Sequence, residues 1–330
     1  MNDYGVDIGT VNTLIYKKNK GVLVNEPSII ATDTLNNKTL AVGNEAKKML
    51  GRSPSTISVD YTVHDGVINS YDKAANMLRD YFGRIPDSFG GNRLMVSIPS
   101  RATAVEKRAV EDVAYAARAK RVHLIEEPIA AAIGADQNIF EPHGRMIVDI
   151  GGGTTEIAVI SLGGVVAYNT LTQAGNQFDR DIINLIRRDH NVLIGDPTAE
   201  MLKIKLANIE EYSTMEFLSV SGRDLAKGLP VNIAVSSDDI RDAIMPSVHS
   251  IIDGIKYTME HVDPELSSDI ISGGILLVGG SSLIHGWDEI IYNSIGVKAE
   301  VVPFPLECVA VGAGIAIDMI DELKKYNSLF

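Results

Sequence analysis

The stretch 148–160, VDIGGGTTEIAVI, places an aspartate, three glycines and two threonines between two apolar runs. The apolar runs predict two strands, and Gly151–Gly153 predicts a tight turn between them. Such a turn lets the backbone approach a ligand closely, and its converging N–H groups bind anions. Thr154 and Thr155 add hydroxyl donors, and Asp149 enters the turn, where its carboxylate could hold a hydrated cation. A glycine-rich hairpin without a ligand is the alternative interpretation.

A similar pattern occurs near the start of the chain, where residues 6–13 read VDIGTVNT. Its Asp7 corresponds to Asp149, a glycine follows two residues later, and hydroxyl and amide side chains come next. Internal repetition indicates two related halves. Two such loops facing each other would bind a polyphosphate from both sides, and Asp7 and Asp149 would hold Mg²⁺ through its waters. The two common phosphate motifs, the Walker loop and the dinucleotide fingerprint, follow no predicted strand.

Composition narrows the class of protein. The chain has 330 residues, which suits two domains or more. Its net charge of −13 argues against a nucleic-acid partner and against purely electrostatic attachment to an anionic membrane. A single cysteine, Cys308, excludes an internal disulfide and suits a reducing compartment. We see no signal peptide and no apolar run of about 18 residues, so we expect a cytoplasmic protein without a membrane span.

Predicted strands and helices alternate along the chain, which indicates α/β architecture. A strand over 93–98 precedes a helix that Thr103 and Glu106 start with a capping box. A strand over 122–125 then precedes a helix over 128–135, with proline at its first position.

The second half repeats this order. We expect a helix over 179–190, a long helical region over 236–262 that is broken or kinked at Pro246, and a last helix over 309–320. Residues 32–62 resemble a small insertion of short strands and one helical patch.

With both glycine loops read, the chain resembles the actin-like ATPase superfamily, and within it the bacterial cell-shape actins of the MreB type. The supporting stretches are NEPSIIA (25–31), AVGNEAKKMLGR (41–52), LIEEPIAAAIGA (124–135), VDIGGGTTEIAVISLGG (148–164), SGRDLAKGLP (221–230), PELSSDII (264–271) and LVGGSSLIHG (277–286). The resemblance covers essentially the whole chain. It implies the actin-like ATPase fold, with two α/β domains split into four subdomains around a nucleotide cleft.

The resemblance also implies domain boundaries. Domain I would cover 1–142, with an insertion subdomain over about 32–62, and the last helix, 311–330, would return to it. Domain II would cover 143–310, with a small subdomain over about 179–237.

The resemblance further implies which residues bind ATP and Mg²⁺. The expected nucleotide contacts are Asp7, Gly9, Thr10, Asn12, Thr13, Asp149, Gly151, Gly152, Gly153, Thr154, Gly175, Glu200, Lys203, Gly279, Gly280, Ser281 and Ser282. Asp7 and Asp149 would hold Mg²⁺ through water. Glu127, with Thr154, would orient the water that attacks the γ-phosphate. Two alternatives stay open: Glu127 could merely favour a helix N-terminus, and Glu200 with Lys203 could be an exposed ion pair.

Three departures from the family pattern concern nucleotide affinity. Relatives usually carry an acidic pair where Asn176 and Gln177 stand. They carry glycine and a small residue where Ser281 and Ser282 stand, and glutamate in place of Lys205. We therefore expect nucleotide binding that is weaker, or less selective between ATP and GTP, than in close relatives.

The implied function is that of an ATP-binding, slowly hydrolysing actin homologue. It would polymerise into filaments on the inner face of the cytoplasmic membrane and help to determine cell shape. Its partners would be further copies of itself, the membrane surface and cell-shape or cell-wall-synthesis membrane proteins. A small-molecule kinase would need its own substrate base, and we see none. A chaperone-type ATPase would need a peptide-binding domain, and only 48 residues follow Ser282.

Membrane attachment has one candidate segment. Only three residues precede Tyr4, too few for an N-terminal helix. The loop 84–92 carries Ile85 and Phe89, which could insert into the interface. The alternative is that both side chains pack under their own loop, and Asp87 also counts against insertion.

Overall fold

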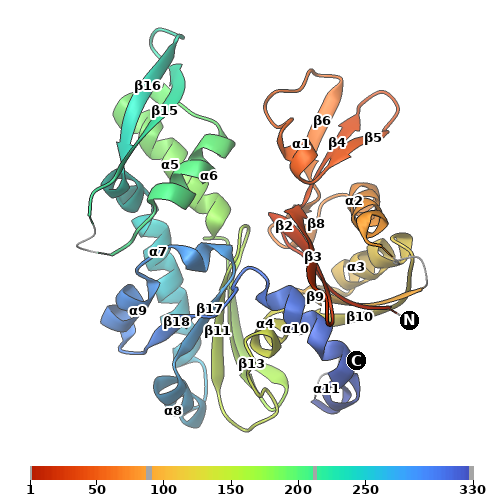
Figure 1. Ribbon diagram of the computed structural model, residues 1–330. Helices are drawn as coiled ribbons and strands as arrows, with labels where there is room; N and C mark the ends of the chain where they lie inside the picture. Colours follow the sequence, from red (N-terminus) through yellow and green to blue (C-terminus); the bar gives the residue numbers. More distant parts are fainter. Residues whose placement is uncertain (1, 87–90, 211–213, 327–330) are drawn as a thin grey trace.

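The structure is a computed structural model that describes residues 2–86, 91–210 and 214–326. It contains two five-stranded sheets (Figure 1). The strands of the first sheet, in the order β10-β9-β1-β2-β3, are β10 (Ala119–Glu126), β9 (Asn92–Ile98), β1 (Asn2–Ile8), β2 (Asn12–Lys17) and β3 (Gly21–Pro27).

The second sheet has the same plan. Its strands, in the order β18-β17-β11-β12-β13, are β18 (Ala299–Val301), β17 (Ile275–Val278), β11 (Arg145–Ile150), β12 (Thr155–Ser161) and β13 (Gly164–Leu171). In each sheet the first three strands along the chain pair antiparallel, and the two later strands add in parallel on the other side of the first. The two sheets are therefore copies of one plan, as the repeated VDIG stretch predicts.

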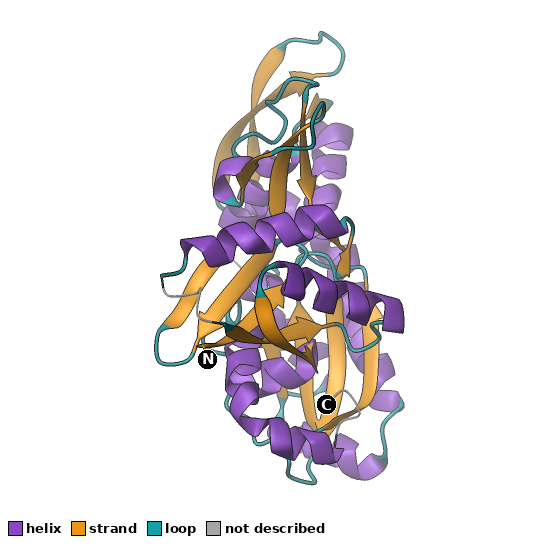
Figure 2. Ribbon diagram, turned by 90° about the vertical axis from the view of Figure 1, so that its right-hand side faces the viewer, coloured by secondary structure: helices purple, strands orange, loops and turns teal. Residues whose placement is uncertain are grey.

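Each glycine turn joins the first two strands of its sheet. The burial of β1, β11 and β12 explains their apolar sequences, because helices cover these sheets. The helices outside the two small sheets are α2 (Tyr71–Arg84), α3 (Ala104–Ala116), α4 (Glu127–Gly134), α7 (Ser237–Glu260), α8 (Pro264–Gly273), α9 (Trp287–Ile295), α10 (Cys308–Ala316) and α11 (Ile320–Tyr326). Figure 2 shows helices lying across the strands on one side of the molecule.

Two smaller sheets form the upper ends of the molecule in Figure 1. One contains β4 (Ile29–Asp33), β5 (Thr39–Val42) and β6 (Ile57–Tyr61), with α1 (Asn44–Lys47) beside it. The other contains β14 (Val192–Leu193), β15 (Phe217–Asp224) and β16 (Pro230–Ser236), with α5 (Gly175–His190) and α6 (Asp196–Leu206). A short hairpin, β7 (Val63–His64) and β8 (Val67–Ile68), leads from the first of these into α2. The domain boundaries given above stay a prediction.

Helices α4 and α10 cross between the two large sheets (Figure 1). The two helices approach closely because glycine residues of each helix face the backbone of the other. A Cβ atom on Gly312 would overlap the carbonyl oxygen of Ala130, and one on Gly134 would overlap that of Cys308. Gly5 of β1 meets α10 in the same way, at Ala310. No side chain larger than hydrogen fits at these points.

Several local predictions differ from the structure. Helix α7 is continuous through Pro246, so of the predicted break or kink the break is wrong, while the kink stays a prediction. Its buried apolar face, which includes Ile244, Val248 and Ile251, compensates for the lost N–H of the proline. The last predicted helix, over 309–320, is interrupted in the structure. It consists of α10, a 3₁₀ turn at Ile317–Met319 and the first residue of α11. The capping box of Thr103 and Glu106 is confirmed.

The predicted membrane loop is only partly described. Ile85 is 5% exposed and packs into the core of the first large sheet, so its proposed insertion into a membrane is wrong for this conformation. The Ile85 side chain is already removed from water by packing with Tyr81 and Phe82, so it gains little from entering a membrane. Phe89 lies outside the described residues. Among the described helices, none combines the length and the apolar character that crossing a bilayer requires.

The helix crossing gives a stability prediction. Gly312→Ala should lower the free energy of unfolding by about 1–3 kcal/mol, because the added methyl group overlaps backbone that cannot move aside easily. Gly83→Ala is the matched control: Gly83 is also helical, but nothing lies within 4 Å of its added Cβ. The control should gain about 0.5–1 kcal/mol. Denaturant unfolding of both variants measures the difference, and equal stability would contradict the packing argument.

Candidate functional site

A cleft of about 1250 Å³ separates the two halves of the molecule. Most of the residues predicted to bind nucleotide line it, although they come from widely separated parts of the sequence. The predicted residues on its wall are Asp7, Gly9, Thr10, Asn12, Glu127, Asp149, Gly151, Gly152, Gly153, Thr154, Gly175, Glu200, Lys203, Gly279, Gly280 and Ser281.

The two glycine turns touch each other at the base of this cleft. A Cβ atom on Gly152 would overlap the side chain of Val11, and one on Gly153 would lie 2.6 Å from Thr10 Oγ1. Thr10 Oγ1 also accepts a hydrogen bond from the Gly66 N–H at 3.0 Å. The glycines are therefore required because the side chains of Thr10 and Val11 on the first turn pack directly against the backbone of the second, and this close meeting of the turns forms the cradle that a polyphosphate needs.

Helix α5 begins at the second turn. The N–H groups of Gly175 and Asn176 donate to the carbonyl oxygens of Gly151 and Gly152 at 3.0 and 2.7 Å. The helix therefore starts four residues earlier than predicted, at Gly175 rather than Asp179. Its first turn fixes the shape of the phosphate turn and leaves room for a ligand beside it.

Asp7 and Asp149 stand at corresponding strand ends and face the cleft. Ser97 Oγ donates to Asp7 Oδ1 at 2.8 Å. Burial raises the pKa of Asp7 to about 6, against the lowering effect of the Ser97 hydrogen bond. Burial and then the charge of Asp7 raise the pKa of Asp149 to about 7. Two crowded carboxylates of this kind become favourable when a divalent cation lies between them.

The arrangement fits Mg²⁺ held through water. Among the described residues, no three carboxylate, histidine or cysteine side chains come together closely enough to hold a metal directly. Mg²⁺ in phosphate sites keeps several waters and uses one or two carboxylates together with phosphate oxygens. Asp7 and Asp149 beside the glycine cradle supply that donor set.

Glu127 is the first residue of α4, immediately before Pro128, and it lines the cleft with Thr154. Burial raises the pKa of Glu127 well above its usual range, and the charges of Glu156, Asp7 and Asp149 raise it further. A partly buried carboxyl group with a raised pKa, facing a phosphate cradle, suits a group that accepts a hydrogen bond or a proton from water.

Glu200 and Lys203 do not pair with each other, so the alternative of an exposed pair is wrong. Lys203 Nζ lies 2.9 Å from Asp179 Oδ1 and 2.9 Å from the Gly175 carbonyl oxygen, which ties α6 to the start of α5. Glu200 instead pairs with Lys47 of α1, at 3.0 Å between Lys47 Nζ and Oε1. This ion pair connects the two sides of the cleft at its mouth.

Two predicted contacts are wrong. Thr13 and Ser282 are fully buried and do not line the cleft. Thr13 Oγ1 lies 2.8 Å from Ser28 Oγ, and Ser282 Oγ donates to the Gly279 carbonyl oxygen at 2.7 Å. Thr13 alternates with Asn12 along β2, so its side chain points away from the cleft. Ser281 lines the cleft, and its hydroxyl donates to the Gly151 carbonyl oxygen at 3.0 Å.

Ser97, Glu156 and Lys47 are among the described residues at the site for which the sequence gives no prediction. Ser97 is the next-to-last residue of β9, beside Asp7, and its place near the end of a parallel strand next to β1 is the signal that indicates it. Glu156 belongs to the quoted VDIGGGTTE stretch and faces Asp149 across β11 and β12. Lys47 meets Glu200 across 153 positions of sequence, and no local pattern indicates such a contact.

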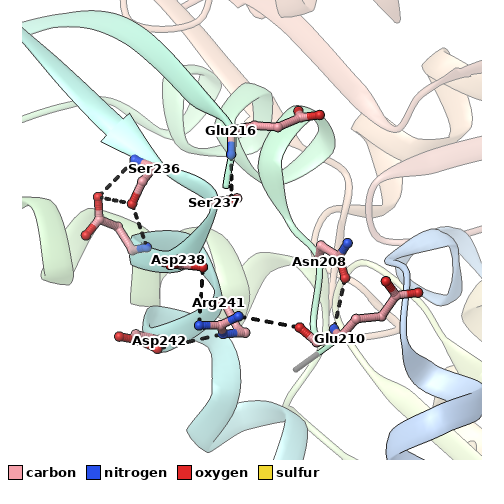
Figure 3. A network of polar contacts seen from close by, with 9 residues as sticks. Asn208, Glu210, Glu216, Ser236, Ser237, Asp238, Arg241 and Asp242 are labelled. Atoms are coloured by element: carbon pink, nitrogen blue, oxygen red, sulfur yellow. Dashed lines mark hydrogen bonds and ion pairs between the residues drawn. The ribbon is translucent and has the colours of Figure 1, made fainter. Parts of the chain in front are cut away.

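The wall of the cleft beyond Lys203 is held by a polar network (Figure 3). Arg241 on α7 lies 3.2 Å from Asp238 and donates to the Glu210 carbonyl oxygen at 3.4 Å. The Glu210 N–H donates to Asn208 Oδ1 at 2.9 Å. These contacts fix the chain that follows α6 against α7. The carboxylate of Glu210 points away from Arg241.

Comparison with known proteins agrees with this geometry. The model of the family described as MreB/Mbl protein matches residues 1–325. The chain is 41% identical to the cell shape-determining protein Mbl of Bacillus subtilis over 325 residues, 98% of each chain. It is 41% identical to the cell shape-determining protein MreB of Escherichia coli over 327 residues, 97% of this chain and 94% of the relative.

Comparison with solved structures also finds similarity to an MreB protein. The crystal structure of MreB5 of Spiroplasma citri bound to ADP superposes with a TM-score of 0.92 at 33% identity, covering 98% of both chains. A second structure of that protein is bound to AMPPNP and also has a TM-score of 0.92. The MamK double helical filament, at 23% identity and a TM-score of 0.81, shows likeness of fold. The actin-like fold predicted from the sequence is confirmed.

The crowded carboxylates predict how stability depends on pH. Because the pKa values of Asp7 and Asp149 are raised in the folded state, the folded protein binds protons more tightly than the unfolded chain. The free energy of unfolding of the protein without nucleotide or Mg²⁺ should therefore fall as pH rises from 5.5 to 8. Denaturant unfolding in a chelator measures this. Asp149→Asn should be more stable than the parent at pH 8 and should show a smaller slope; an unchanged slope would contradict the assignment.

Proposed function

The chain belongs to the MreB/Mbl family, and on that premise we propose that it binds ATP with Mg²⁺ and hydrolyses it slowly as it assembles into filaments. We further propose that these filaments lie on the inner face of the cytoplasmic membrane and help to determine cell shape. The observation that carries the proposal is the meeting of two glycine turns, two aspartates and Glu127 in one cleft. One relative that shares the fold, MreB5 of Spiroplasma citri, has been solved with ADP and with AMPPNP.

Different residues of the cleft would perform different parts of the hydrolysis reaction. The two turns would hold the phosphates through backbone N–H groups, and Asp7 and Asp149 would hold Mg²⁺ through its waters. Mg²⁺ when bound neutralises the charge that develops on the phosphate oxygens. Glu127 and Thr154 would orient a water whose oxygen bonds to the γ-phosphorus as the bond to the bridging oxygen of ADP breaks. The water proton passes to Glu127 or to the released phosphate.

A kinase of the same superfamily is not favoured. Such an enzyme places a second base near the acceptor hydroxyl. Asp7, Asp149 and Glu127 beside the described phosphate cradle have roles in hydrolysis, and Glu156 is only 4% exposed. Of the other carboxylates on the described cleft wall, Asp179 is paired with Lys203 and Glu200 with Lys47. The full-length identity to cell shape-determining relatives points the same way.

Glu127→Gln tests the hydrolysis. The substitution keeps the shape of the side chain but removes the group that accepts the proton or hydrogen bond of the attacking water. The rate of phosphate release should fall about 100-fold or more, while the ATP dissociation constant stays within about threefold. Glu265→Gln, at an exposed position on α8, is the control with the same change of charge. Loss of ATP binding in Glu127→Gln, with unchanged turnover of the ATP still bound, would refute the role.

Assembly is proposed to be head to tail, because such contacts do not close and give open filaments. Sedimentation with ATP distinguishes a filament from a kinase, since only filaments pellet. Self-association is supported by MamK, whose fold is similar and whose structure is a double helical filament. Membrane and cell-wall-synthesis proteins as partners follow from the family relationship alone.

Phe89 is the remaining candidate for membrane contact in the loop 84–92. Phe89→Ser should reduce co-sedimentation of filaments with liposomes, because a buried Phe contributes about 1.5–3 kcal/mol per subunit and a filament repeats that contribution. Leu35→Ser is the matched control, because Leu35 is 83% exposed and lies on a different loop. Both variants should pellet normally with ATP alone. Equal liposome binding by the parent and both variants would exclude Phe89 as the anchor.

A further inference from the structure

Glu156 is a buried carboxylate that lacks a good partner. It lies on β12 directly opposite Asp149, lines the cleft and is 4% exposed. Neither of its oxygens makes a hydrogen bond of ordinary geometry with any described residue. Burial and then the charge of Asp149 raise the pKa of Glu156 to about 8, and the nearby Ser100 N–H offsets this only in part. Native proteins satisfy nearly all buried polar groups, so this exception needs a reason.

Ser100 shares the same deficit. Its Oγ is buried and makes no hydrogen bond with any described residue. Glu156 and Ser100 therefore both carry unsatisfied polar atoms, on two segments that lie side by side where the Ser100 N–H approaches the Glu156 carboxyl group. Buried waters in proteins occupy such places and typically make about three hydrogen bonds to groups that are otherwise unsatisfied. The cleft that Glu156 lines gives water a route to this space.

Glu127 is the neighbour that matters for function. Glu127 is the first residue of α4 and Glu156 is the second residue of β12, and these two elements pack against each other on the wall of the same cleft. The charge of Glu156 helps to raise the pKa of Glu127, as expected of nearby carboxyl groups. A water bound by Glu156 and Ser100 would be within reach of the Glu127 carboxylate on the side away from the phosphates.

We propose that Glu156 and Ser100 hold an ordered water molecule behind Glu127, and that this water fixes the orientation of the Glu127 carboxylate. Glu156 is then a positioning residue, since it acts on the reaction through Glu127 and does not touch ATP. The inference rests on the hydrolysis proposed above. It explains why a carboxylate remains at a place where it contributes no ion pair and no well-formed hydrogen bond.

Two other roles fit less well. A directly bound metal would need further ligands, and the described part of the chain holds no group of three histidine, cysteine, aspartate or glutamate side chains placed to hold one. A purely structural role would require that Glu156 stabilise the fold. An unpaired buried carboxylate does the opposite, because it loses its hydration and gains no compensating partner.

Glu156→Met is the decisive variant, because it keeps the volume and removes both acceptor oxygens. The kcat for ATP should fall about 10- to 100-fold, as expected when the orientation of a reacting group is lost, while KM stays within about threefold. The thermal midpoint should rise above that of the parent. Glu156→Gln, which keeps one acceptor oxygen for the water, should recover part of kcat. Ser100→Ala should show a smaller loss, and Glu265→Gln should match the parent.

Unchanged kcat in Glu156→Met would overturn the proposal, and so would a lower thermal midpoint together with weaker ATP binding. A high-resolution crystal structure of the parent with ADP gives an independent test. It should show a water within about 3.2 Å of both Glu156 and Glu127. Absence of that water would overturn the proposal even if the variants lose activity. If the parent hydrolyses no ATP, the proposed function fails, while the crystal structure still decides whether this water site exists.

Discussion

The contact between the two glycine turns is the constraint on which the site depends. Gly152 meets Val11, and Gly153 meets Thr10, at separations that leave no room for a Cβ atom. The sheets that carry these turns are copies of one plan, so the contact brings corresponding strand ends face to face. Asp7 and Asp149 come together for this reason and not through any direct bond. The glycine crossing of α4 and α10 sets the same close separation at the base of the molecule.

This closeness has an electrostatic consequence. Asp7, Asp149, Glu127 and Glu156 share a partly buried space, and burial is the largest cause of the raised pKa of each. Lys203, a basic residue on the neighbouring wall, is already paired with Asp179. The fold therefore carries acidic groups that reduce its own stability. Natural proteins keep such arrangements where function requires them, and a bound cation with phosphate would remove much of the repulsion.

The sequence predicts what depends on local pattern. Glycine turns after apolar runs, the repeat of VDIG, and a proline after Glu127 all act over a few residues, and the structure brings these elements into one cleft. The direction in which a side chain points from a strand is harder to predict. Thr13 is adjacent to Asn12, yet the pleat of the strand turns the Thr13 side chain into the protein interior.

Packing between segments that are distant in the sequence is harder still to predict. The proline and glycines that follow Ile85 predict a surface loop, but the Ile85 side chain packs in the core with residues of α2. The Lys47–Glu200 pair depends on how two small sheets face each other, which no local pattern encodes.

The two ends of the cleft are held by interactions of different strength. At the base, backbone meets backbone across glycines, and moving the halves apart or together there would break close packing. At the mouth, Lys47 and Glu200 are 29% and 25% exposed, and ion pairs with that much access to water contribute about 1 kcal/mol or less. A ligand that contacts both walls can therefore change the separation of the walls at the mouth at a small cost in free energy, while the base stays fixed. A surface formed jointly by the two small sheets would then depend on what the cleft holds, because a ligand shifts a conformational equilibrium by its difference in affinity for the two states.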